Sequence, residues 1–121
     1  MKEEVKIFKA LGDETRFKIL ILLSSRNICA KGIARQLGIS EAAVSQHIKV
    51  LKEAELIIAY KKGYFVMYEL NLKALEKAIG LINILTKGDF NLISDEYKLN
   101  TTCKSNCKSI KGCCKKIFEE E

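Results

Sequence analysis

Apolar residues recur every three or four positions along most of this chain, up to about residue 87. This spacing is typical of amphipathic helices, because it gathers the apolar side chains on one face. The pattern predicts helices over residues 3–11, 14–24, 30–37, 41–54 and 71–87. The side chains that we expect the first two helices to bury are Val5, Ile7, Phe8, Ala10, Leu11, Phe17, Ile19, Leu20, Leu22 and Leu23.

Residues that favour helix ends stand between these stretches. Asp13, Ser40 and Asn71 each precede a predicted helix, and their side chains can accept a hydrogen bond from a free backbone N–H. Gly38 predicts a tight turn between the short third helix and the fourth. In the fourth helix, the apolar residues that share one face are Val44, Ile48 and Leu51.

Two short runs depart from the helical spacing. Residues 56–60 and 64–70 are rich in β-branched and aromatic residues, and Lys61-Lys62-Gly63 lies between them. This arrangement predicts a β-hairpin, since glycine readily adopts the positive φ that tight turns require. The predicted fold is therefore mainly α with a small β-hairpin wing. Its element order is that of a winged helix-turn-helix.

The fourth predicted helix has the surface of a DNA-reading helix. The major groove, roughly 12 Å wide, admits a helix whose small or polar side chains let the backbone approach the base edges. A lone amphipathic helix with a polar outer face would look the same, so the interpretation depends on the whole ordered set of elements. The candidates are Ser40, Ala42, Ala43, Ser45 and Gln46 for base edges, His47 and Lys49 for phosphates, and Lys61, Lys62 and Tyr64 for the wing.

Composition narrows the function classes. The chain has 121 residues, enough for one domain, with 48% apolar residues and a net charge of +6, which favours nucleic acid or an anionic membrane surface as partner. The start, MKEEVKIF, lacks the features of a signal peptide, and the most apolar stretch is too short to span a bilayer. We therefore expect a cytoplasmic protein with no membrane contact.

Catalytic patterns are missing from the sequence. His47 is the only histidine, and no glycine-rich phosphate loop, carboxylate pair or nucleophile–base spacing occurs. We expect no enzyme activity and no small-molecule substrate.

The cysteines divide the chain into two parts. Cys29 stands alone, whereas the four others lie within twelve residues near the C-terminus: Cys103, Cys107, Cys113 and Cys114. The division predicts a DNA-binding and dimerisation domain over residues 1–88 and a Cys/Lys-rich tail over residues 89–121. Because cytoplasmic thiols stay reduced, clustered cysteines indicate metal or redox chemistry before structural disulfides.

Thiolates select soft or borderline acceptors, so As(III), Cd(II), Pb(II), Zn(II) and an Fe–S cluster are all candidate ligands of the tail. Three interpretations remain open: effector binding, a redox or Fe–S switch, and incidental cysteines in a soluble tail. Cys29 is either a small buried side chain or a ligand shared with the tail.

Three segments of the sequence resemble the ArsR-type family of metal- and stress-sensing repressors. They are FKALGDETRFKILILL at 8–23, IARQLGISEAAVSQHIKVLKEAELI at 33–57 and KKGYFVMYEL at 61–70. The resemblance implies a homodimer paired through the first and last helices of the body, and release of DNA when a ligand binds. Some family members also use a vicinal cysteine pair near the C-terminus for As(III), as Cys113-Cys114 would allow.

The chain departs from the family at several positions. Glu55 stands where the family usually has glycine, so that helix end could differ. Cys29 matches the first cysteine of the arsenic-sensing pair, but Lys31 replaces the second. Residues 71–87 contain no Asp or His, so the zinc site that the zinc-sensing branch of the family places there is absent.

These observations lead to one leading hypothesis and two alternatives. The leading hypothesis is a homodimeric repressor that binds palindromic double-stranded operator DNA and is released by a thiolate-bound effector, with As(III) first and Cd(II), Pb(II) or Zn(II) next. The alternatives are a redox- or Fe–S-sensing DNA-binding regulator and a metal-buffering protein that uses the tail alone.

Overall fold

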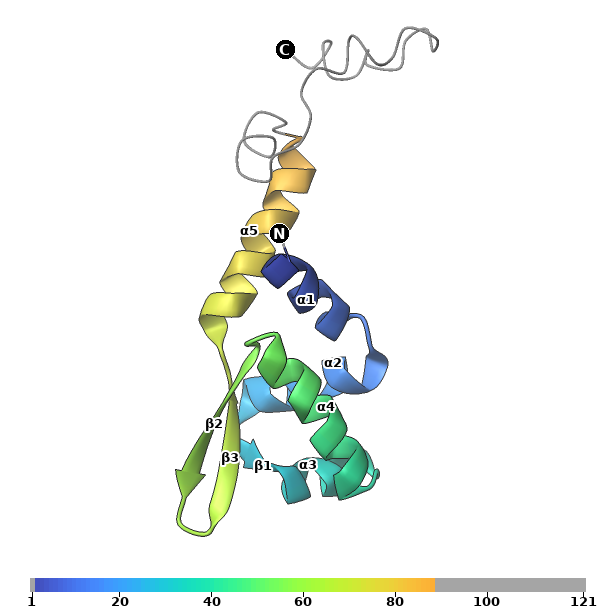
Figure 1. Cartoon of the computed structure of the whole chain (residues 1–121), viewed down its shortest axis with the longest axis vertical. Helices are drawn as coiled ribbons and strands as arrows, with labels where there is room; N and C mark the ends of the chain where they lie inside the picture. Colours follow the sequence, from blue (N-terminus) through green and yellow to red (C-terminus); the bar gives the residue numbers. More distant parts are fainter. Residues whose placement is uncertain (1, 89–121) are drawn as a thin grey trace, which may run out of the picture. The chain divides into compact units, whose positions relative to one another are not determined.

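A computed structural model describes residues 2–88 of the chain. The four clustered cysteines and the rest of the predicted tail lie outside the described residues, so those predictions stay predictions. Within the described residues, those up to Gly80 belong to one compact unit and those from Leu81 to Gly88 belong to a second. The elements in Figure 1 are α1 (Lys2–Leu11), α2 (Glu14–Ser25), β1 (Ile28–Cys29), α3 (Ala30–Leu37), α4 (Glu41–Glu53), β2 (Ile57–Lys62), β3 (Phe65–Leu70) and α5 (Leu72–Lys87).

All five predicted helices are present, with ends within one residue of the expected positions. Two of the predicted caps are confirmed: Asp13 accepts a hydrogen bond from the Arg16 backbone N–H, and Ser40 accepts one from the Ala43 N–H. Local sequence therefore determines where these helices begin, because a cap requires only residues that are three positions apart.

The predicted hairpin is part of a three-stranded antiparallel sheet with the order β1-β3-β2. β1 was not predicted. It has two residues, Ile28 and Cys29, which pair with Tyr68 and Met67 of β3. Lys61 and Lys62 belong to β2 rather than to the turn. The turn is shorter than expected, and Gly63 enters it with a φ of 63°.

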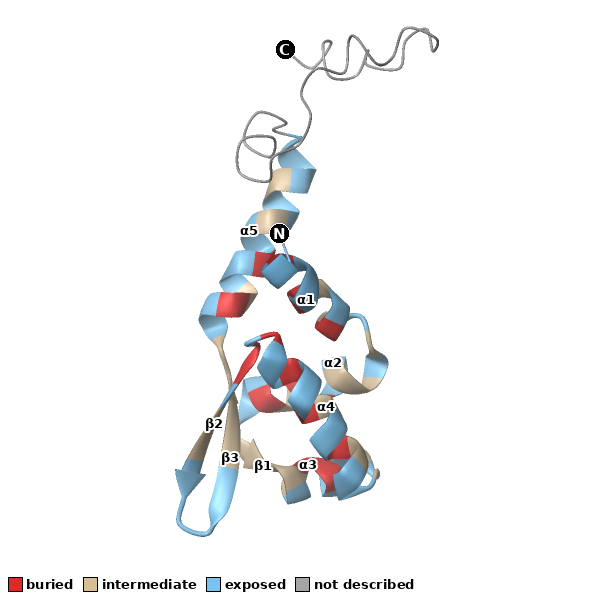
Figure 2. Cartoon of the chain, in the orientation of Figure 1, coloured by how far each residue is buried: buried red, intermediate tan, exposed pale blue. Residues whose placement is uncertain are grey.

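The core lies where α1–α4 meet the inner face of the sheet and the start of α5. Figure 2 shows the buried positions on the facing sides of these helices. Burying a side chain of this size contributes roughly 1.5–3 kcal/mol. The largest fully buried side chains are Ile19, Ile33, Val44, Leu51 and Leu56.

Some apolar residues that we expected in the core are not there. Phe17 is 49% exposed, and Val5 is also exposed, although Ile7, Ala10, Ile19, Leu20 and Leu23 are buried as expected. Phe8, Leu11 and Leu22 are partly buried against the core. The prediction for Phe17 was wrong because apolar residues lie on all sides of α2, and a surface helix buries only one side.

The junction between α4 and β2 contains an unusual backbone conformation. Glu55 has a φ of 59°, and among the described residues it is the one non-glycine residue with a positive φ. The Asn71 side-chain amide donates to the Glu55 carbonyl oxygen at 2.8 Å. That amide thus stabilises the junction, and no Asn71 side-chain cap of α5 was found. Just beyond the end of α4, Glu55 thus has a left-handed backbone conformation, although it is a glutamate where the family usually has glycine.

None of the helices in residues 2–88 combines the length and the apolar character that a membrane-spanning segment requires.

Candidate nucleic-acid interface

Two short helices and a sharp turn form the centre of the candidate site. α3 ends at Gly38, whose φ of 68° turns the chain, and the Gly38 and Ile39 N–H groups both donate to the Ala34 carbonyl oxygen. Ser40 follows, and its hydroxyl oxygen lies 3.1 Å from the Ala43 nitrogen that donates to it. α4 therefore starts three residues after Gly38, and α3 packs against it.

The two sides of α4 differ sharply. Val44, Ile48 and Leu51 are buried on the inner side. The residues exposed on the outer side of its N-terminal half, together with its cap, are Ser40, Ala42, Ser45, Gln46 and Lys49, which we call the reading face. The other two candidates, Ala43 and His47, are half-buried. The structure thus places small and polar side chains where a close approach to a partner is possible.

The wing supplies positive charge beside the reading face. Lys61, Lys62 and Tyr64 are all exposed, and Tyr64 is fully so. Figure 1 shows the hairpin tip and the N-terminal end of α4 at the same end of the fold. Within the hairpin, residues 57–70, Glu69 is the only acidic residue, and it lies far from the tip.

A groove of about 370 Å³ separates α4 from β3. Ser45, Lys49 and Lys52 line it on the helix side, and Tyr68 lines it on the strand side. Glu53 also lines the groove, so its charged lining is two lysines and one carboxylate. The two lysines are suited to a phosphate backbone, which carries one negative charge per nucleotide.

Sequence reasoning missed two features of the wing. Phe65 is 58% exposed next to the tip, and only the register, which pairs it with Lys62, places it there. Asn27 braces the sheet, because its side-chain amide donates to the Tyr60 hydroxyl at 3.0 Å and to the Glu69 carboxylate at 3.3 Å. The β-propensity of Phe65 had indicated a strand but not its exposure.

His47 lies on the flank of α4 that faces the start of α2. Its Nδ1 is 3.9 Å from the Asp13 carboxylate, and its side chain is 25% exposed. The Arg16 backbone N–H donates to Asp13, and with the charges of Arg16 and His47 it holds the pKa of this carboxyl below its usual value. Of the candidate phosphate contacts in the described part of the chain, His47 is the one within ion-pair distance of a carboxylate.

Cys29 is half-buried at the start of α3, opposite Met67 of β3. Residues 2–88 contain no cluster of three or more His, Cys, Asp or Glu side chains that could hold a metal ion. Cys29 is the one cysteine of residues 2–88, so a site that takes several thiolates from a single chain has to use the cysteines beyond residue 88.

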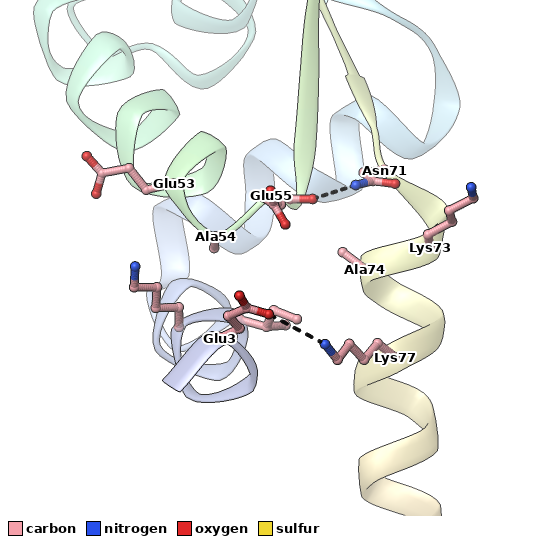
Figure 3. Close-up of a pocket in the computed structure, with 10 residues that line it drawn as sticks. Glu3, Glu53, Ala54, Glu55, Asn71, Lys73, Ala74 and Lys77 are labelled. Atoms are coloured by element: carbon pink, nitrogen blue, oxygen red, sulfur yellow. Dashed lines mark hydrogen bonds and ion pairs between the residues drawn. The ribbon is translucent and has the colours of Figure 1, made fainter. Parts of the chain in front are cut away.

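A recess of about 450 Å³ lies at the other end of α4, between α1 and the start of α5 (Figure 3). Ile7, Ala54 and Ala74 give it apolar lining. Charged side chains also line it, and Lys77 forms ion pairs with Glu3 at 3.9 Å and with Glu4 at 3.6 Å. These pairs link α1 to α5 at a distance from the reading face.

α5 has an exposed apolar side. Ile79 is 58% exposed and Leu85 is 70% exposed, and Leu72 and Ile82 are exposed as well. These residues carry the helical spacing seen in the sequence, yet in this single chain they do not enter the core. We call them the α5 stripe.

Comparison with known proteins agrees with this geometry. The family description "Bacterial regulatory protein, arsR family" matches residues 13–59, which run from the start of α2 to the first half of β2. The transcriptional repressor SdpR of Bacillus subtilis (strain 168) is 41% identical over 87 residues, which are 71% of this chain and 97% of the relative. An arsenical resistance operon repressor of Staphylococcus aureus is 32% identical over 97 residues, 80% of this chain and 93% of the relative.

Solved structures show the same fold. An ArsR-like transcriptional regulator from Rhodococcus sp. RHA1 superimposes with a TM-score of 0.67 at 27% identity, covering 84% of this chain and 96% of that one. The homodimeric winged helix-turn-helix domain of Mb0332 from Mycobacterium bovis gives a TM-score of 0.59 at 21% identity, covering 74% and 82% of the two chains.

Proposed function

Because the chain belongs to the arsR family of bacterial regulatory proteins, and so is a DNA-binding transcriptional repressor and not an enzyme, we propose that it acts as a cytoplasmic homodimer on palindromic operator DNA. We further propose that an effector bound by the clustered cysteines releases it. As(III) is the first candidate for that effector.

One observation supports DNA reading most directly: the reading face and the lysine-bearing wing tip lie at the same end of the fold. In this arrangement Ala42 or Ala43 contacts a thymine methyl group and Gln46 pairs with adenine in the major groove. Lys49, Lys61, Lys62 and Tyr64 contact the backbone or the minor groove beside it.

The α5 stripe supports the homodimer. Exposed leucine and isoleucine side chains in a row are unfavourable in water, and burial against a second copy of the same helix would remove them from it. The Mycobacterium bovis neighbour is itself described as homodimeric. Two copies would place the two reading faces about one helical turn of DNA apart, as a palindromic operator requires.

The effector proposal rests on the donor set in the sequence. Cys103, Cys107, Cys113 and Cys114 offer four thiolates, and three suffice for pyramidal As(III), whereas all four suit tetrahedral Zn(II) or Cd(II). Several relatives of this chain, the Staphylococcus aureus repressor among them, are named for arsenical resistance, whereas the name of SdpR mentions no metal. Ligand binding and DNA binding would be coupled by about 1–3 kcal/mol.

Fluorescence anisotropy tests both parts of the proposal. Labelled DNA from upstream of the protein's own gene is titrated with the full-length protein, and As(III), Cd(II), Zn(II) or peroxide is then added. We expect specific binding in the nanomolar range and release by As(III) at the lowest concentration.

Two variants serve as controls. Cys113→Ser/Cys114→Ser should bind DNA as wild type does but stay bound in the presence of As(III), whereas Cys29→Ser should still be released. Release by peroxide alone, or a visible absorption band after anaerobic purification, would replace the metalloid with a redox or Fe–S effector. Tight metal binding without any DNA binding would leave only a metal-buffering function.

A further inference from the structure

Three polar side chains meet where α1, α2 and α4 come together. Asp13 caps α2, with its carboxylate oxygen 3.0 Å from the Arg16 nitrogen. The same carboxylate is 3.9 Å from Nδ1 of His47 on α4. We call Asp13, Arg16 and His47 the corner cluster.

Arg16 extends the cluster to α1. Its Nε donates to the Ala10 carbonyl oxygen at 2.9 Å, and Nη2 donates to the Lys9 carbonyl oxygen at 3.2 Å. These carbonyl groups belong to the last turn of α1, where few backbone N–H groups remain to bond them, although the Lys9 carbonyl also accepts from the Gly12 N–H at 3.2 Å. A guanidinium at a helix C-terminus also interacts favourably with the helix dipole. The corner cluster thus joins the end of α1, the start of α2 and the middle of α4.

The position of His47 differs from that of Lys49, although both are candidates for phosphate contact. Lys49 is exposed and has no acidic partner in residues 2–88, whereas the half-buried His47 faces a carboxylate. An imidazole turned toward Asp13 is poorly placed to neutralise a phosphate. It is well placed to keep α4 against the α1–α2 corner.

We infer that His47 is a positioning residue, which with Asp13 and Arg16 sets the angle at which the reading helix meets DNA. This inference rests on the proposed DNA-reading role of α4. It also provides a route between the two functional surfaces, because the helix that Arg16 caps, α1, is one of the two that we expect at the dimer interface. A change in the dimer would reach α4 through the cluster.

The test compares three single variants and one double variant of the full-length protein. Asp13→Asn keeps an N-cap, since asparagine caps helices as well as aspartate does, but it removes the charge that faces His47. His47→Gln removes the imidazole. Lys49→Gln is the control for a phosphate contact. Circular dichroism and thermal melting confirm that each variant is folded.

We expect Asp13→Asn and His47→Gln each to weaken operator binding about threefold to tenfold, with no change in the slope of log K against log salt concentration. The double variant Asp13→Asn/His47→Gln should bind the operator no more weakly than the poorer binder of these two single variants, because both changes break the same contact. The two single variants Asp13→Asn and His47→Gln should also discriminate less between operators whose half-site spacing differs by one base pair. Simple destabilisation of the fold would not produce this effect. Lys49→Gln should instead reduce the salt slope by about two for a dimer.

The inference fails if His47→Gln lowers the salt slope as Lys49→Gln does, because His47 would then be a phosphate contact. It also fails if Asp13→Asn binds every operator as wild type does. Neither result would affect the proposed function, which fails separately if the wild-type protein binds no DNA from its own upstream region.

Discussion

The reading face and the α5 stripe are both exposed, but their chemistry is opposite. The reading face presents alanine, serine and glutamine side chains beside lysines, whereas the α5 stripe presents leucine and isoleucine. A surface of small polar groups and positive charge fits a hydrated polyanion, and a row of branched apolar side chains fits another apolar surface. This difference in chemistry is why we propose DNA as the partner of the reading face and a second copy of the chain as the partner of the α5 stripe.

The largest expected effect comes from putting a charge into the α5 stripe. Ile79→Glu should convert the dimer to a monomer, because a buried carboxylate in an apolar interface is strongly unfavourable. Operator affinity should fall at least a hundredfold once the two half-sites are no longer bound together. Sedimentation equilibrium and anisotropy measure the two effects. Glu76→Gln, an exposed change on the same helix, is the control, and a dimeric Ile79→Glu protein would contradict the assignment of the stripe.

The next largest effect belongs to the reading face. Gln46→Ala should reduce the preference for one base pair in each half-site by about 1–2 kcal/mol, with binding to random DNA unchanged. Competition assays with operators substituted at each position measure it. If the Gln46→Ala variant keeps the base-pair preference of the wild-type protein at every operator position, Gln46 does not contact a base.

A smaller change is expected at the wing. Lys62→Ala should weaken binding to all sequences about threefold to fivefold and lower the salt slope by about two, one phosphate contact for each protomer. Anisotropy from low to high salt gives the slope. Glu69→Gln, at the other end of the hairpin, should leave the slope near that of wild type, and an unchanged slope for Lys62→Ala would exclude the wing contact.

The smallest effect tests the junction at the opposite end of α4 from the reading face. Glu55→Gly should raise the free energy of unfolding by about 0.5–1 kcal/mol, because glycine adopts a positive φ without the steric cost of a Cβ atom. Urea denaturation measures this gain. Oligomeric state and operator affinity should stay the same, and a destabilised variant would mean that the Glu55 side chain itself makes a stabilising contact.

Much of the fold followed from short-range patterns. The ends of α2 and α4 could be predicted because Asp13 and Ser40 cap N–H groups only three residues away. The hairpin could be predicted for a similar reason, since Gly63 and the flanking β-branched residues act locally. The buried side of α4 likewise followed from the spacing of Val44, Ile48 and Leu51.

Other features depend on contacts between distant residues. β1 consists of Ile28 and Cys29, which pair with residues about forty positions later, and two residues carry too little pattern to be recognised as a strand. The left-handed Glu55 conformation could not be predicted from a glutamate, and it coincides with a hydrogen bond from Asn71. The contact between His47 and Asp13 requires α2 and α4 to be packed together.

By itself, the sequence determined the helices, the hairpin and the buried side of α4, because helix caps, turn residues and apolar spacing act over a few neighbouring positions. The tertiary structure alone decided which apolar faces enter the core and which, like the α5 stripe and Phe17, remain outside. The physical reason is that periodicity shows only that a face is apolar. What covers that face depends on how the elements pack. Apolar side chains that are buried in the core and apolar side chains that contact a partner follow the same helical spacing.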